Sequence, residues 1–202
     1  DQSAIVRSVR ELGVGPGGFY TPSYAGGGEL KLRMMCLGKH WEPRTAQYED
    51  TRSSFDGATP PPIPEEFLSL VGQAMSAARD VQGVGLLPDV APDICLCNFY
   101  EKSGTLGLHQ DRDESQASLR RGTPVVSFSI GDAAEFLYST NRNEATADVV
   151  RLESGDVLIF GGKSRMLFHG IRSIFPSTAP NDLILSTSLR PGRLNLTFRQ
   201  FL

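Results

Sequence analysis

Two histidines and one aspartate are the side chains of this sequence best suited to bind a metal ion. His109 and Asp111 lie two residues apart, so in a strand both side chains point to one face and can reach one ion. His169 follows 60 positions later, and a sheet that folds back can bring its strand beside the first. Two histidines and one carboxylate with open positions are typical of non-haem Fe(II) sites. A His-x-Asp triplet also occurs by chance, but two of only three histidines stand in these settings.

A second set of polar residues lies near the end of the chain, in the stretch Arg-Leu-Asn-Leu-Thr-Phe-Arg at 193–199. Its alternation predicts a strand with Arg193, Asn195 and Arg199 on one face and apolar residues on the other. Guanidinium groups that point into a protein need anions, and their planar shape matches carboxylates and phosphates. The alternative is an exposed edge strand whose arginines are solvated.

The predicted metal site suggests which anion these arginines bind. An iron site of this kind commonly needs a co-substrate that supplies two electrons, and 2-oxoglutarate is a dicarboxylate with one end for the metal and one for a cation. Arg193 and Arg199 could therefore bind its two ends. Asn98 and Tyr100, which share a face of an earlier predicted strand, could add hydrogen bonds.

Composition limits the classes of protein to which the chain can belong. Its 202 residues, with 40% apolar and 21% charged residues, predict one globular domain with additions. The net charge of −3 argues against a uniformly basic, sequence-independent nucleic-acid coat, although the part from Val157 onward carries six basic residues and one acidic residue. No apolar run approaches the roughly 18 residues that a membrane span requires. We therefore expect no membrane association and a monomer.

Three cysteines indicate a reducing environment. Cys36, Cys95 and Cys97 are odd in number, lack the spacing of a disulfide framework and are too few for a zinc site. Cys95 and Cys97 share one face of a predicted strand, where we expect buried thiols. The expected location is the nucleus or the cytoplasm, with an organelle also open because the sequence starts at Asp1 without a methionine.

The elements that must position these groups are short strands. The 21 glycines and 13 prolines favour turns over long helices, and residues 1–30 are expected to be loops with at most a short strand. The stretch 64–79 predicts an amphipathic packing helix. Strands are expected at 30–37, from 93 to 100, and at 106–111, 124–130, 134–138, 149–152, 156–160, 166–169 and 193–201. This pattern predicts a mainly β sandwich or jelly roll.

The motifs together resemble the AlkB family of nucleic-acid dioxygenases, and the closing Arg-Pro-Gly-Arg-Leu-Asn-Leu-Thr-Phe-Arg-Gln is similar to the AlkB homologue 1 type, plausibly of plant origin. The other matching motifs are His109-x-Asp111-x-Asp113-Glu114 and Gly-Gly-Lys-Ser-Arg-x-x-x-His169-Gly. The resemblance runs from about residue 30 to the end. It implies an α+β fold built on a double-stranded β-helix, with an N-terminal nucleotide-recognition lid. We therefore divide the chain into loops and lid (1–58), packing helix (59–84) and jelly-roll core (85–202).

The resemblance also implies roles for individual residues. Iron would bind to His109, Asp111 and His169. The co-substrate 2-oxoglutarate would bind to Asn98, Tyr100, Arg193, Asn195 and Arg199, with Arg193 at the distal carboxylate and Arg199 at the end near the metal.

For the substrate, the resemblance implies that a flipped methylated base stacks between Trp41 and His109. Tyr48 would contact phosphate or sugar, Asp113 would face the exocyclic amine of the base, and Arg142 is a weaker match. A lone tryptophan is otherwise commonly a core residue, so Trp41 could also serve packing.

The implied reaction is oxidative demethylation of N-methylated bases in DNA or RNA with Fe(II), 2-oxoglutarate and O2, releasing formaldehyde, succinate and CO2. The candidate bases are 1-methyladenine, 3-methylcytosine and N6-methyladenine. Two alternatives remain open from the sequence: a dioxygenase of protein or small-molecule substrates, and a module that binds modified bases without turnover.

Overall fold

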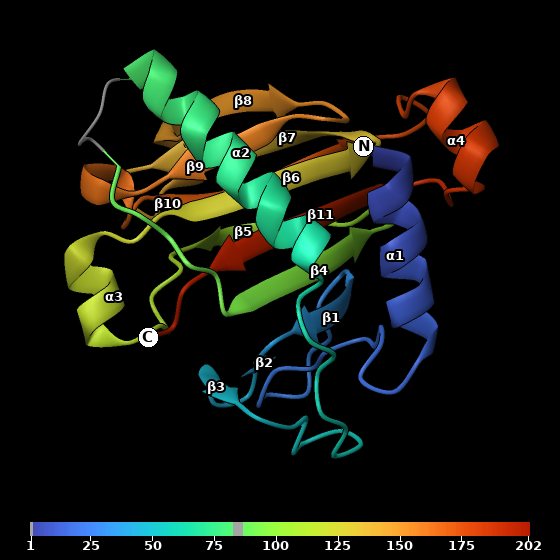
Figure 1. Ribbon diagram of the computed structural model, residues 1–202, viewed down its shortest axis with the longest axis horizontal. Helices are drawn as coiled ribbons and strands as arrows, with labels where there is room; N and C mark the ends of the chain where they lie inside the picture. Colours follow the sequence, from blue (N-terminus) through green and yellow to red (C-terminus); the bar gives the residue numbers. More distant parts are fainter. Residues whose placement is uncertain (1, 83–86) are drawn as a thin grey trace.

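Two antiparallel β-sheets form the centre of the protein (Figure 1). The structure is a computed structural model that describes residues 2–82 and 87–202. The larger sheet has the strand order β1-β4-β11-β6-β9, and the smaller sheet has the order β5-β10-β7-β8. The strands of the larger sheet are β1 (Arg33–Leu37), β4 (Ile94–Tyr100), β11 (Arg193–Arg199), β6 (Val125–Gly131) and β9 (Val157–Phe160). Those of the smaller sheet are β5 (Leu106–His109), β10 (Phe168–Phe175), β7 (Ala133–Ser139) and β8 (Asp148–Leu152).

The two sheets pack face to face, as a jelly roll requires. Ile94 and Leu96 of the larger sheet belong to the same buried cluster as Phe136 and Ile171 of the smaller one. The odd-numbered residues of β4 point the other way, so Cys95 joins the core on the outer face. The predicted alternation along β4 and the predicted double-stranded β-helix are thereby confirmed.

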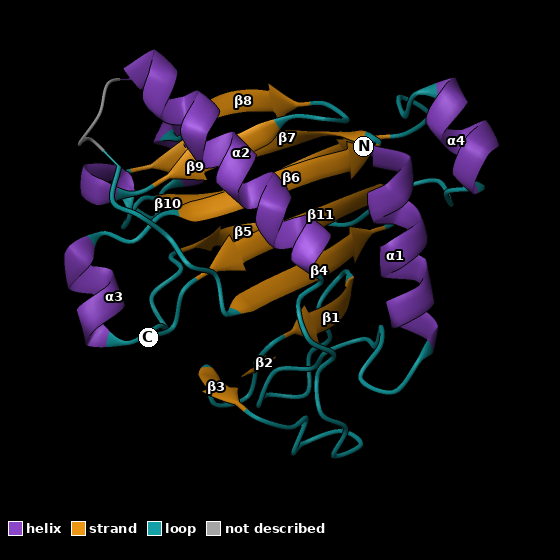
Figure 2. Ribbon diagram, in the orientation of Figure 1, coloured by secondary structure: helices purple, strands orange, loops and turns teal. Residues whose placement is uncertain are grey.

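Helices cover the outer face of the larger sheet. Figure 2 shows α2 (Glu65–Gln82) lying across that sheet, with α1 (Gln2–Val14) beside it. Phe67, Val71 and Met75 of α2 are buried in the same core as β4, β6 and β11, because they recur at helical spacing along one side. The packing helix predicted at 64–79 is confirmed. None of the helices in the described ranges is both long and apolar enough to cross a lipid bilayer.

The prediction of loops for residues 1–30 is wrong for α1. Ile5, Val6 and Val9 form a narrow apolar stripe that packs into the core of the outer face. Arg7 Nη2 donates to the carbonyl of Ser186, so the helix is also tied to α4 (Asn181–Thr187). The helix was not predicted because its sequence was read together with the glycine-rich stretch that follows it. Long-range contacts, and not local propensity, stabilise it.

Two further differences concern the length of one strand and the presence of an additional helix. Strand β10 runs to Phe175, well beyond the predicted end at His169, and α3 (Gln116–Arg121) lies in a stretch for which no helix was predicted. Ser115 caps α3 at its start, and Gly122 ends it in a left-handed conformation with φ of 66°. These two residues are short-range signals that sequence reasoning missed.

A small hairpin projects from the edge of the larger sheet and carries the predicted lid residues. It consists of β2 (His40–Glu42) and β3 (Gln47–Glu49), and Trp41 lies opposite Tyr48. The proposed segment 1–58 thus combines this hairpin with α1, which packs in the core. The proposed boundary between 84 and 85 lies outside the described residues.

Candidate metal centre

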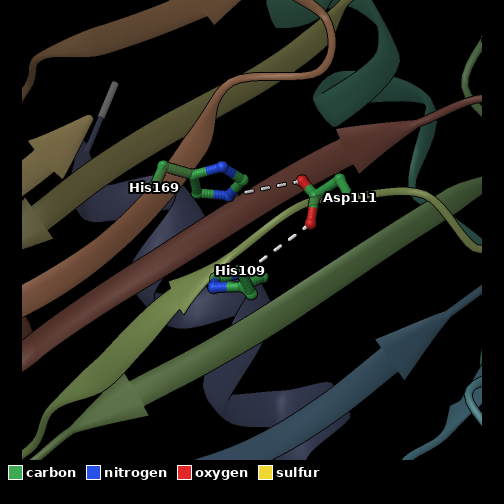
Figure 3. A group of neighbouring side chains, drawn as sticks. All are labelled: His109, Asp111 and His169. Atoms are coloured by element: carbon green, nitrogen blue, oxygen red, sulfur yellow. Dashed lines mark ion pairs between the residues drawn. The ribbon is translucent and has the colours of Figure 1, made fainter. Parts of the chain in front are cut away.

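Three potential metal ligands converge between the two sheets (Figure 3). His109 is the last residue of β5, and His169 lies on β10. Asp111 lies two residues beyond the end of β5, a strand that was predicted to run to 111. Strands β5 and β10 pair antiparallel with His169 opposite His109, which places the two imidazoles side by side with ring centroids 4.4 Å apart. One ligand atom from each of the three residues lies within 4.8 Å of the others. The predicted convergence of these residues is confirmed.

Hydrogen bonds orient both imidazoles toward the aspartate. Nδ1 of His109 lies 2.9 Å from the carbonyl oxygen of Gly107, and Nδ1 of His169 lies 3.2 Å from that of Leu167. Each Nδ1–H can donate to its carbonyl, which leaves Nε2 unprotonated and directed inward. This second contact is what commonly fixes a metal-binding histidine.

The spacing of the three side chains fits a shared cation. Nε2 of His109 lies 3.7 Å from Asp111 Oδ1, and Nε2 of His169 lies 3.6 Å from Asp111 Oδ2. These distances exceed a normal hydrogen bond, but they suit two atoms that each bind one ion at about 2.0 to 2.2 Å. Asp111 Oδ2 is also buried and has no hydrogen-bond partner within residues 2–82 and 87–202. The residues therefore fit a resident metal ion.

Electrostatics keep Asp111 and His169 in their metal-binding forms. Burial acts to raise the pKa of Asp111, but the Arg199 guanidinium and the two imidazoles outweigh it and bring the pKa to about 2. Burial lowers the pKa of His169 to about 4, against the opposing attraction of Asp111. The aspartate is thus ionised and His169 is neutral near pH 7, as metal ligation requires.

The side chain of Arg193 lines the same cavity as the triad and is buried without an anionic partner in the described part of the chain. Only 1% of Arg193 is exposed, and its Nη2 donates to Ser129 Oγ at 2.9 Å. Its Nε and Nη1 have no hydrogen-bond partner among the described residues. Burial lowers the pKa of this guanidinium, which reflects the cost of a cation without a counter-ion. Such a group fits a ligand that brings a carboxylate.

Arg193 and the metal triad line one cavity, which we call the inner cavity. The other predicted anion-binding residues line it too: Asn98, Tyr100, Asn195 and Arg199. Asn98 and Asn195 lie opposite each other on paired strands, and Tyr100 lies opposite Arg193. Asn98 Oδ1 is buried and has no hydrogen-bond partner in the described ranges, whereas the Asn195 amide donates to Ser127 Oγ at 2.7 Å. Strand register alone brings these side chains together.

Arg199 connects this cavity to the metal triad. Its Nη2 lies 2.7 Å from Asp111 Oδ1, and its Nη1 donates to the hydroxyl of Tyr48 at 2.9 Å and to Glu114 Oε1 at 3.3 Å. Its Nε is buried and has no partner among the described residues. Arg199 is thus close to the metal end, and Arg193 lies six residues back on the same strand face.

A wider cleft opens from the triad toward the hairpin. Trp41, Asp113, Arg142 and His109 all line it, so the structure brings these predicted substrate residues to one place. The indole Nε1 of Trp41 donates to Asp113 Oδ2 at 2.8 Å. The tryptophan is therefore a partly buried residue of the cleft wall, and it also packs against the buried cluster between the sheets.

Tyr48 occupies a different position from the one expected of a phosphate or sugar contact. It does not line the cleft, and its hydroxyl donates to Glu114 Oε1 at 3.2 Å while it accepts from Arg199. Its ring packs edge-on against Phe201, with centroids 5.6 Å apart. Glu114 and its partner Arg165 had no predicted role, although both stand inside the motifs that carry the resemblance.

The comparisons with known proteins agree with this geometry. The model of the family "2OG-Fe(II) oxygenase superfamily" matches residues 1–199. The chain is 55% identical to DNA N(6)-methyladenine demethylase ALKBH1C of Arabidopsis thaliana, over 100% of this chain and 46% of that protein. It is 52% identical to ALKBH1D of the same plant, over 99% and 46%. The solved structure of OsALKBH1, from rice, superposes with a TM-score of 0.92 at 57% identity, over 99% of this chain and 91% of that one.

The chain spans less than half the length of these two curated relatives, 46% in each case. The superfamily implies Fe(II) as the metal of the centre and 2-oxoglutarate and O2 as its co-substrates. The donor set of His109, Asp111 and His169 fits that chemistry. On the match over residues 1–199 and the superposition on OsALKBH1, the chain belongs to the 2OG-Fe(II) oxygenase superfamily and, within it, to the AlkB homologue 1 type.

Proposed function

We propose that this protein removes methyl groups oxidatively from N-methylated bases in DNA or RNA, with Fe(II) and 2-oxoglutarate. One observation carries the proposal most directly. A metal-ligand triad lines the same cavity as Arg193, a buried guanidinium without a counter-ion among the described residues, and Arg199, six residues from Arg193 on one strand face, contacts the triad. A ligand with two carboxyl ends, one for the metal and one for a cation, satisfies both.

The residues divide into two groups in this assignment. His109, Asp111 and His169 hold the iron through two imidazole nitrogens and a carboxylate. Arg193 takes the distal carboxylate of 2-oxoglutarate, and Arg199 takes the end near the metal. Asn98, Tyr100 and Asn195 add hydrogen bonds from facing positions on β4 and β11.

When loaded with iron and 2-oxoglutarate, the centre supplies an oxidant that converts an N-methyl group to a hydroxymethyl group. That product releases formaldehyde and leaves the unmodified base. The protein positions the reactants and limits water, because Phe136 and Phe160 surround His169 with apolar rings at 5.7 and 5.0 Å. No protein nucleophile is needed.

The cleft between the hairpin and the triad receives the base. Trp41 and the His109 imidazole lie on its walls and offer flat surfaces for stacking. Asp113 offers a carboxylate to an exocyclic amine, and Arg142 at the rim offers a cation to the nucleic-acid backbone. The names of the Arabidopsis relatives make N6-methyladenine in DNA the first candidate, ahead of 1-methyladenine and 3-methylcytosine. We propose that the protein acts as a monomer.

A panel of oligonucleotides tests this proposal. DNA and RNA strands carrying N6-methyladenine, 1-methyladenine or 3-methylcytosine are incubated with the protein, Fe(II), 2-oxoglutarate and O2, and bases are quantified by mass spectrometry. Loss of one methylated base, dependent on 2-oxoglutarate, is expected. Binding of the oligonucleotides with no succinate would identify a non-catalytic binding module. Succinate formation with no loss of any base would indicate another substrate class.

A further inference from the structure

Behind the metal triad lies a chain of four buried charges of alternating sign. Arg165, Glu114, Arg199 and Asp111 follow one another, and each contacts the next. Between 0% and 9% of each side chain is exposed, so solvent screens these contacts little. Asp111 is assigned to iron and Arg199 to 2-oxoglutarate, whereas Glu114 and Arg165 have no role in the proposed function.

Glu114 is the branch point of this chain, because its two oxygens serve different partners. Oε2 accepts from Arg165 Nη2 at 2.9 Å. Oε1 accepts from Arg199 Nη1 at 3.3 Å and from the Tyr48 hydroxyl at 3.2 Å. A carboxylate that is completely buried between two guanidiniums fixes the direction of both planar groups.

Arg165 in turn holds the main chain that carries the metal ligand. Its Nη1 donates to the carbonyl of Asp111, and its Nε donates to the carbonyl of Thr123 at 2.9 Å. Asp111 and Thr123 stand at the two ends of the segment that contains α3. The Arg165 guanidinium therefore links both ends of this segment to Glu114. The position of Asp111 relative to the histidines therefore depends on Arg165.

The contact with Glu114 also determines which donors Arg199 can offer. Nη1 is occupied by Glu114 and Tyr48, and Nη2 by Asp111, so that Nε is the nitrogen of Arg199 that is buried without a partner among the described residues. Without Glu114, the guanidinium could rotate so that both Nη groups face the remaining carboxylate of Asp111. The donor assigned to 2-oxoglutarate would then be lost from its place.

We propose that Glu114 and Arg165 are positioning residues for the co-substrate and the metal ligand. Glu114 orients Arg199 for the metal-proximal carboxylate of 2-oxoglutarate, and Arg165 holds the main chain of Asp111. This proposal rests on the proposed function, since it assumes that 2-oxoglutarate binds at Arg199. Neither residue touches the reacting atoms, so both act through a neighbour.

Calorimetric titration of 2-oxoglutarate into Mn(II)-loaded protein tests the proposal without turnover. Glu114→Gln keeps the shape of the side chain and removes its charge. Because Arg199 then faces a neutral amide in place of a carboxylate, the charge-assisted contact that orients it is lost, and we expect the Kd for 2-oxoglutarate to rise by about 10- to 100-fold. Glu135→Gln is the matched control: it removes the acid of an exposed ion pair with Arg172 on the smaller sheet and should bind as the wild type does.

Removing Glu114 alone leaves two buried cations short of an anion, which could prevent folding. The double variant Glu114→Gln, Arg165→Gln restores the balance of charge and should fold, while Arg199 still lacks its carboxylate. We expect the same rise in Kd in this variant. Circular dichroism and the melting temperature establish that each variant is folded before titration.

The outcomes separate this proposal from the proposed function. If the wild type fails to bind 2-oxoglutarate, the proposed function is overturned together with the positioning role. If the wild type binds and a folded variant at Glu114 binds equally well, only the positioning role is overturned. A change in melting temperature with an unchanged Kd would likewise make the buried charges purely structural.

Discussion

The inner cavity, which holds Arg193 and the triad, and the cleft beside the hairpin, which holds Trp41 and Asp113, differ in how their side chains are positioned. Strand register aligns the cavity: Arg193 faces Tyr100 and Asn195 faces Asn98 on paired strands. The cleft depends on a hairpin with two strands of three residues each, whose Trp41 is held by one side-chain hydrogen bond to Asp113. Paired strands fix the positions of the cavity side chains through the register of their backbones, whereas side-chain contacts hold Trp41 and Tyr48 of the short hairpin. We therefore expect variants in the cavity to affect the co-substrate and the metal, and variants in the hairpin to affect the oligonucleotide.

The largest effect is expected at the metal. His109→Ala removes an imidazole ligand and leaves Asp111 and His169, so iron-dependent succinate formation should fall below detection. Mass spectrometry of succinate, with and without added iron, checks this. Full turnover in a folded His109→Ala protein would contradict the assignment of the triad.

Arg199→Met removes the cation that lies between Asp111 and Glu114. Two buried carboxylates then face each other, and we expect a loss of about 3 to 5 kcal/mol in the free energy of unfolding. The requirement for 2-oxoglutarate should rise far more than oligonucleotide binding weakens. Urea unfolding and binding titrations give the two quantities, and equal losses in both affinities would argue against the role of Arg199.

Arg193→Met should have the opposite effect on stability, although it lies on the same strand face. Because Arg193 has no counter-ion among the residues that the structure describes, its removal should raise the free energy of unfolding by about 1 to 3 kcal/mol. The Kd for 2-oxoglutarate should rise about 100-fold or more, since the distal carboxylate loses its partner. A destabilised variant that still binds 2-oxoglutarate would refute this reading of the cavity.

In the hairpin, Trp41→Ala should weaken binding of the methylated oligonucleotide by about 1 to 3 kcal/mol, because one stacking surface is lost. The Kd for 2-oxoglutarate should stay at its wild-type value. Fluorescence anisotropy of a labelled oligonucleotide and calorimetry measure the two affinities. Trp41→Phe, which keeps a flat ring, should lose less, and a loss as large as that of alanine would argue against stacking.

The smallest effect is expected from Tyr48→Phe. Tyr48 belongs to the hairpin but contacts Arg199 of the inner cavity, so this variant shows which of the two sites the residue serves. The variant keeps the ring against Phe201 and removes the hydroxyl between Glu114 and Arg199. The loss should be about 0.5 to 1.5 kcal/mol of stability, with a modest rise in the Kd for 2-oxoglutarate. If only oligonucleotide affinity changes, Tyr48 belongs to the substrate cleft, as the family resemblance implied.

The cavity could be predicted from the sequence because strands have a period of two. Alternation along 193–199 and along β4 identified the inward side chains, and the structure places them on one cavity. The convergence of His109 and His169 required a topology as well, and the jelly roll supplied it. Local alternation thus identifies which side chains point inward, whereas the pairing of distant strands requires the topology.

Other features depend on contacts between distant residues, so local patterns could not reveal them. Glu114 and Arg165 are 51 positions apart, and their pairing is not visible until the loops around α3 and β10 meet. The helix α1 has only a narrow apolar stripe and is stabilised by its packing against the sheet and α4. The contacts of Tyr48 were missed for the same reason.

The central claim is that the buried triad and the two arginines form one centre for oxidative demethylation. Its most direct test counts products from a single methylated oligonucleotide in the presence of Fe(II), 2-oxoglutarate and O2. The account predicts equal amounts of succinate, formaldehyde and demethylated base, with none formed when 2-oxoglutarate is left out. Demethylation that proceeds without 2-oxoglutarate, or base binding with no succinate at all, would contradict it.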